Sequence, residues 1–171
     1  EVERRARIDA QQQALWGHSL GGLFVLNALY TRPAAFQSYL AASPSLWWSQ
    51  GAALGDPEQQ FVQNVHGQPA KLWLMLGGAE RVGDRGKRDM NNPRVVAHLR
   101  RIGGATPDAA MQLSQRLGKV PGLSVQYREF DGLGHGPMLP ASFHAALHEL
   151  YGVTDRSVGD GALNGSDNAA E

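Results

Sequence analysis

A single stretch, residues 15–24 (LWGHSLGGLF), constrains the fold of this chain more than any other. Apolar residues precede its serine, and apolar residues at helical spacing follow it, so the pattern predicts a strand that turns directly into a helix. Gly17 and Gly21 flank the serine, and we expect the tight turn to close only because neither position carries a Cβ atom. This arrangement is typical of a nucleophile elbow, which projects the Ser19 hydroxyl outward from a strained turn.

Leu20 follows the serine and begins the expected helix. The first N–H groups of a helix have no partner within it and carry a partial positive charge. The Leu20 N–H is therefore the expected donor to a developing oxyanion. The motif is short and also occurs by chance, so the alternative is that Ser19 merely ends a strand at a glycine-rich turn. His135, in a later loop, favours the catalytic interpretation.

Length, charge and cysteine content exclude several classes of protein. The 171 residues are enough for one ordinary domain, or for part of a larger one. The formal net charge is +0 with scattered basic residues, so neither nucleic acid nor an anionic membrane is an expected partner. No apolar run has the length of a membrane span, and the start, EVERR, lacks the apolar core of a signal peptide. The absence of cysteine excludes disulfides and thiolate chemistry, and it fits the cytoplasm and the periplasm alike.

The order of apolar segments predicts an α/β fold with a mostly parallel sheet and flanking helices. We expect strands at 14–16, 36–43, 71–76 and 123–130, and helices at 20–30, 57–62, 92–102, 106–117 and 140–151. Asn92 before Pro93, and Thr106 before Pro107, are expected helix starts. The alternation of apolar and polar residues in 123–130 indicates a strand near a sheet edge. Residues 1–13 are expected to form a short surface helix, or a helix end, and then a loop.

Candidate partners for the serine come from two later segments. Glu80, Asp84 and Asp89 follow the third expected strand, and in hydrolases the acid commonly comes from such a loop, between nucleophile and histidine in chain order. His135 lies among glycines in 131–137, where a close approach is possible, and imidazole exchanges protons near neutral pH. His18 is adjacent to the serine, but we expect it to point away and pack the elbow.

Two pairs of large or ligating side chains remain. Trp47 and Trp48 follow the carboxyl end of the second expected strand, where ligands bind in open α/β sheets, so they line a substrate pocket or instead cap the core. His144 and His148 lie four residues apart on the last expected helix. Without a third ligand nearby they favour a solvated face, and we expect neither a metal nor another cofactor.

The chain resembles the esterase branch of the α/β-hydrolases. The resemblance rests on Ile8 with Asp9, on 17–24 (GHSLGGLF), on Pro33 and Phe36, on 42–48 (ASPSLWW) and on 134–136 (GHG). That branch includes esterase D-like enzymes and, closer to this pattern, the trilactone esterases that open catecholate siderophores of the enterobactin and salmochelin type. The similarity covers residues 1–151.

The resemblance implies roles for individual residues. Ser19 is then the nucleophile, His135 the general base, and Glu80 the residue where the family places a carboxylate. Some siderophore esterases work as a Ser–His dyad, so Asp84, Asp89 or no acid at all remain alternatives to Glu80.

The resemblance also implies that the chain is the C-terminal part of an α/β-hydrolase fold. A nucleophile elbow normally follows several strands, but here it comes before residue 20. We therefore expect the N-terminal strands to be missing, together with the loop that donates a second oxyanion N–H, which leaves only that of Leu20. We expect residues 1–151 to form this partial domain and residues 152–171, rich in Gly, Asp, Asn and Ser, to be a disordered tail.

The expected function is hydrolysis of carboxylic esters through an acyl-enzyme on Ser19. Three interpretations stay open. The substrate is a siderophore lactone whose aromatic acyl groups stack on Trp47 and Trp48, or the chain is a general carboxylesterase or thioesterase, or it is a truncated, inactive fragment that acts only as an interaction module. The expected partner is a small-molecule ester, in the first case a catecholate siderophore; the sequence leaves the oligomeric state undetermined.

Overall fold

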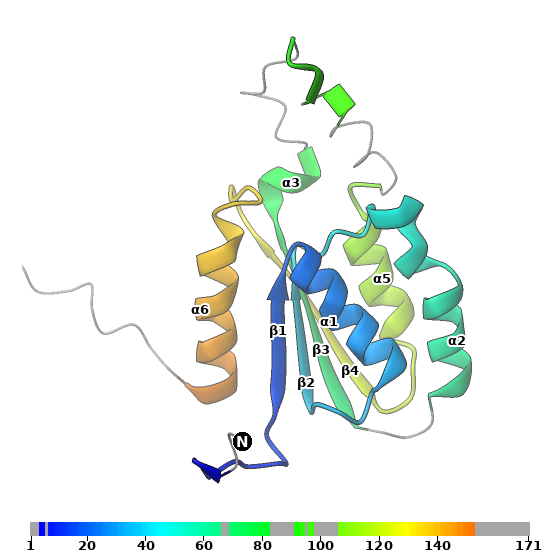
Figure 1. The fold of residues 1–171 in the computed structure, drawn as a ribbon, viewed down its shortest axis with the longest axis vertical. Helices are drawn as coiled ribbons and strands as arrows, with labels where there is room; N and C mark the ends of the chain where they lie inside the picture. The colour runs from blue at the N-terminus through cyan, green and yellow to red at the C-terminus, as the bar shows by residue number, and fades with distance from the viewer. Residues whose placement is uncertain are drawn as a thin grey trace, which may run out of the picture.

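The computed structural model describes residues 4–5, 7–65, 69–82, 91–94, 96–97 and 106–152. Its centre is one parallel sheet in the order β1–β2–β3–β4, formed by β1 (Ala14–His18), β2 (Ser38–Ala42), β3 (Ala70–Gly77) and β4 (Leu123–Phe130) (Figure 1). Because the strands are parallel, their carboxyl ends share one edge of the sheet, at the top of Figure 1. This is the edge at which open α/β sheets bind ligands.

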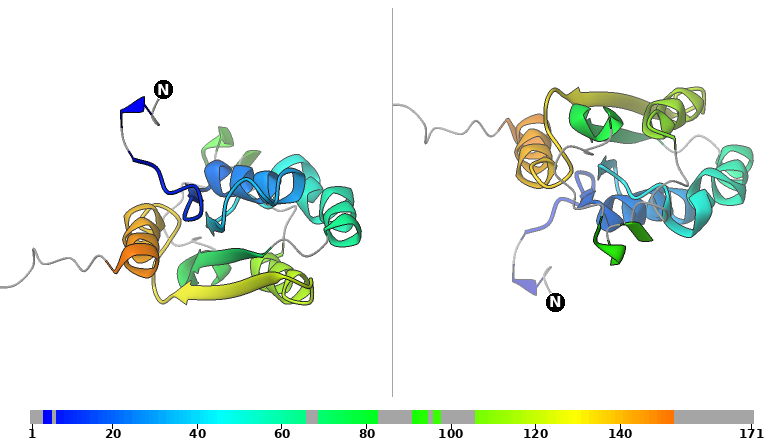
Figure 2. Two further views of the ribbon diagram at one scale, coloured as in Figure 1. Left: turned by 90° about the horizontal axis from the view of Figure 1, so that it is seen from below. Right: turned by 90° about the horizontal axis from the view of Figure 1, so that it is seen from above.

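Helices cover both faces of the sheet. Three pack on one face: α1 (Leu20–Thr31), α2 (Asp56–Asn64) and α5 (Ala109–Leu117). The other face is covered by α6 (Met138–Tyr151), which Figures 1 and 2 show on the opposite side of the strands from the other three. Two short elements lie near the carboxyl edge, a 3₁₀ segment, η2 (Trp48–Leu54), and α3 (Gly78–Val82).

Alternate residues of the central strands fill two separate cores. In β2, Tyr39 and Ala41 pack beneath α1, whereas Leu40 and Ala42 face α6. All of β2 is buried, as expected for a parallel strand covered on both faces. The nearly continuous apolar run that predicted this strand is therefore a consequence of its central position.

Each outer strand of the described sheet has one neighbour. Within the described part of the chain, β1 pairs only with β2, and β4 pairs only with β3. In β4, exposed residues alternate with more buried ones, which confirms the expected edge position of 123–130. The strand that carries the elbow is thus the other edge of this sheet.

Most expected elements are present, with small shifts of their ends. The helix expected at 106–117 begins only at Ala109, and Asp108 precedes it without a side-chain capping bond, because the Asp108 carboxylate binds Arg81 Nη2 at 2.6 Å. Asn92 caps a helical turn as expected, since its Oδ1 accepts the Arg94 N–H at 2.9 Å. Most of the helix expected at 92–102 lies outside the described residues.

The structure describes most of the N-terminal segment but little of the expected C-terminal tail. Residues 7–13 form a loop, as expected for the end of the segment 1–13, and Asp9 Oδ1 accepts the Gln11 N–H at 2.9 Å in a local turn. Most of the short helix expected before this loop lies outside the described residues. Such side-chain bonds compete with helix formation. The tail expected at 152–171 lies outside the described residues from 153 onward.

Candidate active site

Ser19 occupies a strained turn between β1 and α1. Its φ of 60° and ψ of −118° lie in a region that residues other than glycine rarely adopt. Hydrogen bonds from the end of β2 stabilise this conformation: the Ser19 N–H donates to the Ala42 carbonyl at 3.0 Å, and the Ser19 carbonyl accepts the Ser45 N–H at 3.1 Å. The backbone of the elbow is therefore fixed by the neighbouring strand.

The steric requirement for glycine differs from the expected one. A Cβ at Gly17 would collide with the backbone of Gly21, so the first glycine is required as expected. A Cβ at Gly21 would meet nothing within 4 Å, so the expectation that this second position must be bare is wrong. The crowded position is instead Gly22, where a Cβ would lie 2.8 Å from the Ala42 carbonyl oxygen. The close approach of α1 to the end of β2 depends on Gly22.

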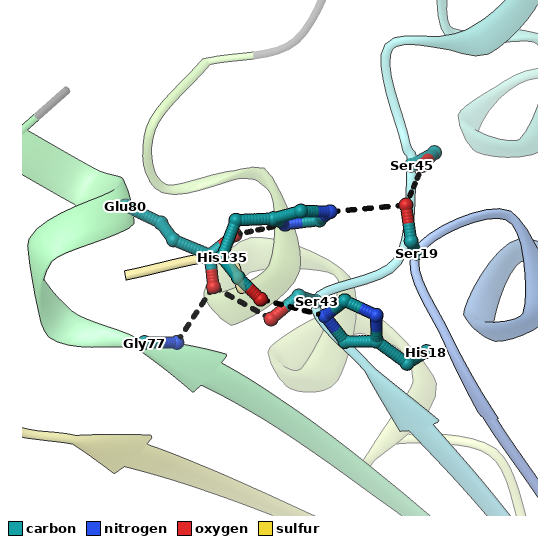
Figure 3. A network of polar contacts seen from close by, with 7 residues as sticks. All are labelled: His18, Ser19, Ser43, Ser45, Gly77, Glu80 and His135. Atoms are coloured by element: carbon teal, nitrogen blue, oxygen red, sulfur yellow. Dashed lines mark hydrogen bonds and ion pairs between the residues drawn. The ribbon is translucent and has the colours of Figure 1, made fainter. Parts of the chain in front are cut away.

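Three side chains expected from the sequence meet at the carboxyl edge of the sheet (Figure 3). His135 Nε2 lies 3.0 Å from Ser19 Oγ, and His135 Nδ1 lies 2.7 Å from Glu80 Oε2. A carboxylate accepts hydrogen bonds, so the Nδ1 atom carries the proton and Nε2 is left as the acceptor for the Ser19 hydroxyl. The result is an unbroken chain of hydrogen bonds from the carboxylate to the hydroxyl.

Glu80 is held as a carboxylate by three donors. Its Oε1 atom accepts the Ser43 hydroxyl at 2.6 Å and the Gly77 N–H at 3.0 Å, while Oε2 faces His135. Burial by itself would raise the pKa of Glu80, but the hydrogen bonds from His135, Ser43 and Gly77 outweigh it and leave the pKa below its usual value. The group is therefore ionised at neutral pH, as a partner for a protonated imidazole must be.

A charge cluster on the next residue orients the short helix α3 that carries Glu80. Arg81 donates to Glu129 at 3.0 Å and to Asp108 at 2.6 Å, which ties α3 to β4 and to the start of α5. Both acidic partners raise the pKa of Arg81, which stays charged. Adjacent residues of α3 thus serve two purposes, one side chain facing the imidazole and the other fixing the helix.

His18 does not point away from the site, contrary to expectation. Its Nε2 atom lies 2.9 Å from the backbone carbonyl oxygen of His135, and the two imidazole rings are 4.6 Å apart between centroids. Only a protonated nitrogen can donate to a carbonyl, so His18 Nε2 carries a proton. Burial, and then the charge of His135, lower the pKa of His18. The lowered pKa favours the neutral form of His18, which then holds the His135 loop through this hydrogen bond.

Two serines that the sequence analysis did not single out complete the site. Ser43, at a φ of 42°, donates to Glu80, and Ser45 Oγ lies 3.2 Å from Ser19 Oγ. Both flank Pro44 directly after β2, where Figure 3 shows them beside the chain of hydrogen bonds. The signal that could have found them is the Ser-Pro-Ser pattern at a strand end, quoted above only as part of the family resemblance.

The other expected site residues lie near the same edge. Leu20 is the first residue of α1, so its N–H belongs to the first turn, where no intrahelical partner is available. Trp47 is half-buried and Trp48 is 48% exposed, with ring centroids 5.8 Å apart. Much of the Trp48 surface is therefore free for contact with a ligand. The alternative, that both rings cap the core, is wrong for Trp48.

Asp84 and Asp89, the alternatives to Glu80, lie outside the described residues. His144 and His148 are both exposed on α6, as a solvated face predicts. The described part of the chain contains no group of three His, Cys, Asp or Glu residues that could hold a metal ion. Among the described helices, none combines the length and the apolar character that crossing a bilayer requires.

The parallel sheet, the strained serine between strand and helix, and the acid and histidine at the carboxyl edge define the class of this protein, an α/β-hydrolase fold. The family model described as "Putative esterase" matches residues 2–102, and the chain belongs to this family. The esterase family expected from the sequence motifs is confirmed.

Individual relatives agree with this assignment. The chain is 36% identical over 151 residues to the ferri-bacillibactin esterase BesA of Bacillus subtilis, covering 86% of this chain and 45% of that protein. It is 33% identical over 152 residues to the apo-salmochelin esterase of Escherichia coli, covering 89% of this chain and 42% of that protein. Both relatives are more than twice as long as the part of them that this chain matches.

A solved structure shows the same fold. The siderophore hydrolase EstB from Aspergillus nidulans superposes with a TM-score of 0.69 at 28% sequence identity, over 87% of this chain and 51% of that one. The expected architecture, a parallel sheet with flanking helices corresponding to part of an α/β-hydrolase fold, is confirmed. The chain spans about half the length of the relatives that it matches.

Proposed function

We propose that this chain is a serine hydrolase of carboxylic esters, with Ser19 as nucleophile, His135 as general base and Glu80 as the acid that orients the imidazole and stabilises its protonated form. The observation that carries the proposal is the uninterrupted sequence of contacts from Glu80 Oε2 to His135 and on to Ser19 Oγ, at 2.7 and 3.0 Å. The strained backbone of Ser19 supports it, because such strain persists at sites where geometry serves function.

The reaction follows from these positions. His135 Nε2 takes the Ser19 proton as Oγ forms a bond to the ester carbonyl carbon, and the π electron pair moves onto the carbonyl oxygen. The Leu20 N–H stabilises that oxyanion. The pair then returns, the bond to the leaving alkoxide breaks, and His135 gives its proton to the departing alcohol. Water repeats the sequence on the acyl-enzyme and frees Ser19.

Glu80 acts electrostatically throughout these steps. It fixes the His135 tautomer that leaves Nε2 free, and its negative charge stabilises the imidazolium that forms when Ser19 loses its proton. Ser43 and the Gly77 N–H keep Glu80 ionised, so the acid does not compete for the proton. The acid stays a carboxylate through the whole cycle.

We propose a siderophore ester as the substrate class. Relatives named for ferri-bacillibactin and salmochelin support this choice. The exposed ring of Trp48 also supports it, because a catecholate acyl group offers an aromatic face, and aromatic pairs contribute about 0.5–1.5 kcal/mol beyond their buried area. Replacing Trp48 by Ala should then raise KM for a catecholate trilactone by about 2- to 12-fold. Its kcat on p-nitrophenyl acetate should not change.

The test of the proposal compares three proteins on two substrates. Wild type should hydrolyse p-nitrophenyl acetate and a catecholate trilactone, and Ser19→Ala should hydrolyse neither while unfolding at the wild-type temperature. Ser142→Ala, which removes a buried hydroxyl that donates within α6 to the Leu139 carbonyl, is the matched control and should retain activity.

Other outcomes separate the remaining interpretations. Turnover of simple esters or thioesters without the trilactone would replace the siderophore role by a general carboxylesterase or thioesterase. No turnover by a folded wild-type chain would favour an inactive fragment that acts as an interaction module.

A further inference from the structure

Ser45 is held against the nucleophile at two points. Its N–H donates to the Ser19 carbonyl at 3.1 Å, and its Oγ lies 3.2 Å from Ser19 Oγ. The residue is only 2% exposed, so its hydroxyl has little access to solvent. The Ser45 hydroxyl therefore faces the Ser19 hydroxyl rather than solvent.

The direction of the hydrogen bond follows from counting protons. His135 Nδ1 carries a proton for Glu80, so His135 Nε2 must accept one from Ser19. The single Ser19 proton is therefore engaged, and Ser19 Oγ can face Ser45 only as an acceptor. Ser45 is the donor in this pair, with its proton directed at the space around the nucleophile.

We propose that Ser45 is a further catalytic residue, whose hydroxyl donates a second hydrogen bond to the oxyanion beside that of the Leu20 N–H. This inference rests on the proposed hydrolase function. In the tetrahedral intermediate the oxyanion and Ser19 Oγ are bonded to the same carbon atom. The oxyanion is therefore only two bonds away from the atom that Ser45 already contacts. A hydroxyl rotates about its Cβ–Oγ bond, so the proton can turn from Oγ to the oxyanion as charge develops there.

The electron and proton balance of the step is unchanged by this donor. The Ser19 proton goes to His135 Nε2, the Oγ–carbon bond forms, and the π pair moves onto the carbonyl oxygen. Ser45 keeps its own proton and only redirects its hydrogen bond. Because Ser45 is fixed by its backbone before the substrate arrives, little reorganisation is needed during the reaction.

Ser43, the other serine of the pair around Pro44, does not compete for this role. Its hydroxyl donates to Glu80 Oε1 at 2.6 Å and is therefore occupied. At the end of β2, Ser43 therefore stabilises the Glu80 carboxylate, and Ser45 faces the Ser19 hydroxyl.

The test uses the full chain and one pair of substrates, a p-nitrophenyl ester and the matching thionoester, in which sulfur replaces the carbonyl oxygen. Sulfur is a weak hydrogen-bond acceptor, so a lost oxyanion donor matters less for the thionoester. Ser45→Ala should lower kcat on the ester by about 10²-fold or more. It should lower kcat on the thionoester much less, and Ser142→Ala should lower neither.

The design separates this inference from the function on which it rests. If wild type hydrolyses the ester and Ser45→Ala matches its kcat, or loses both substrates equally, the oxyanion role of Ser45 is overturned while the hydrolase stands. If wild type itself has no turnover, the proposed function fails. Should Ser45→Ala not fold, Ser45→Cys carries the same test, because it keeps a similar shape and replaces a strong donor by a weak one.

Discussion

Glu80 Oε2 lies 2.7 Å from His135 Nδ1, although 55 positions separate the two residues along the chain. Parallel strands bring them together, because β3 ends directly before α3 and β4 ends directly before the loop that carries the histidine. The second carboxylate oxygen is occupied by Ser43 and by the Gly77 N–H. The orientation of the imidazole is therefore set by contacts from three strand ends.

The charge of this carboxylate should matter more than its shape. Glu80→Gln keeps nearly the same volume but removes the charge that stabilises the imidazolium, so we expect kcat to fall by about 10²- to 10⁴-fold with KM little changed. Steady-state hydrolysis of p-nitrophenyl acetate measures this. Glu149→Gln, on the exposed part of α6, is the matched control. Wild-type kcat in Glu80→Gln would indicate a Ser–His dyad instead.

The same carboxylate should make the fold sensitive to acid. In the folded chain the pKa of Glu80 lies below 4.5, its ordinary value, so its contribution to stability is complete above that pH and is lost as the pH falls through the folded-state pKa. Urea unfolding between about pH 6 and pH 3 should show a smaller loss of stability for Glu80→Gln than for wild type. Equal acid sensitivity of the two proteins would contradict this origin.

His18 should act through the backbone of the loop that carries His135. His18→Ala removes the donor to the His135 carbonyl, a bond of about 1 kcal/mol, so we expect kcat to fall about fivefold. His18→Gln offers an amide donor and should recover most of the loss. His144→Ala, an exposed histidine on α6, is the control. A rise in KM alone, with kcat unchanged, would assign His18 to substrate binding rather than to positioning.

Two glycines of the elbow should respond differently to the same added methyl group. Gly17→Ala forces a Cβ against the Gly21 backbone, so we expect a loss of stability of about 1–3 kcal/mol together with lost activity, because Ser19 must shift. In Gly21→Ala the added Cβ has no neighbour within 4 Å, and alanine favours the helix α1 more than glycine does. We therefore expect this substitution to leave the free energy of unfolding unchanged or to raise it by up to about 1 kcal/mol. Unfolding by urea, with activity assays on both variants, compares them. Equal destabilisation would contradict the steric account.

The sequence predicts the fold well where burial decides the pattern. The strand at 123–130 matches β4 because its alternation reflects a sheet edge, and the continuous run at 36–43 reflects a central strand. The start of α5 was missed for a different reason. The Asp108 carboxylate binds Arg81, 27 positions away, and no local pattern reports that contact.

The site divides in a similar way. The meeting of Ser19, His135 and Glu80 could be predicted, because each belongs to a motif or a chain order of the hydrolase pattern. His18 was placed wrongly, since its partner is a carbonyl 117 positions distant. Ser43 and Ser45 follow the end of β2, where the meeting of strands, rather than any spacing, brings them into contact with Glu80 and Ser19.

The central claim, that Ser19 is activated by His135, is tested most directly by covalent labelling. Phenylmethylsulfonyl fluoride should form one adduct, which peptide mapping places on Ser19, and His135→Ala should slow its formation by orders of magnitude while the protein stays folded. An adduct on another residue, or labelling of Ser19 at the wild-type rate without His135, would contradict the account.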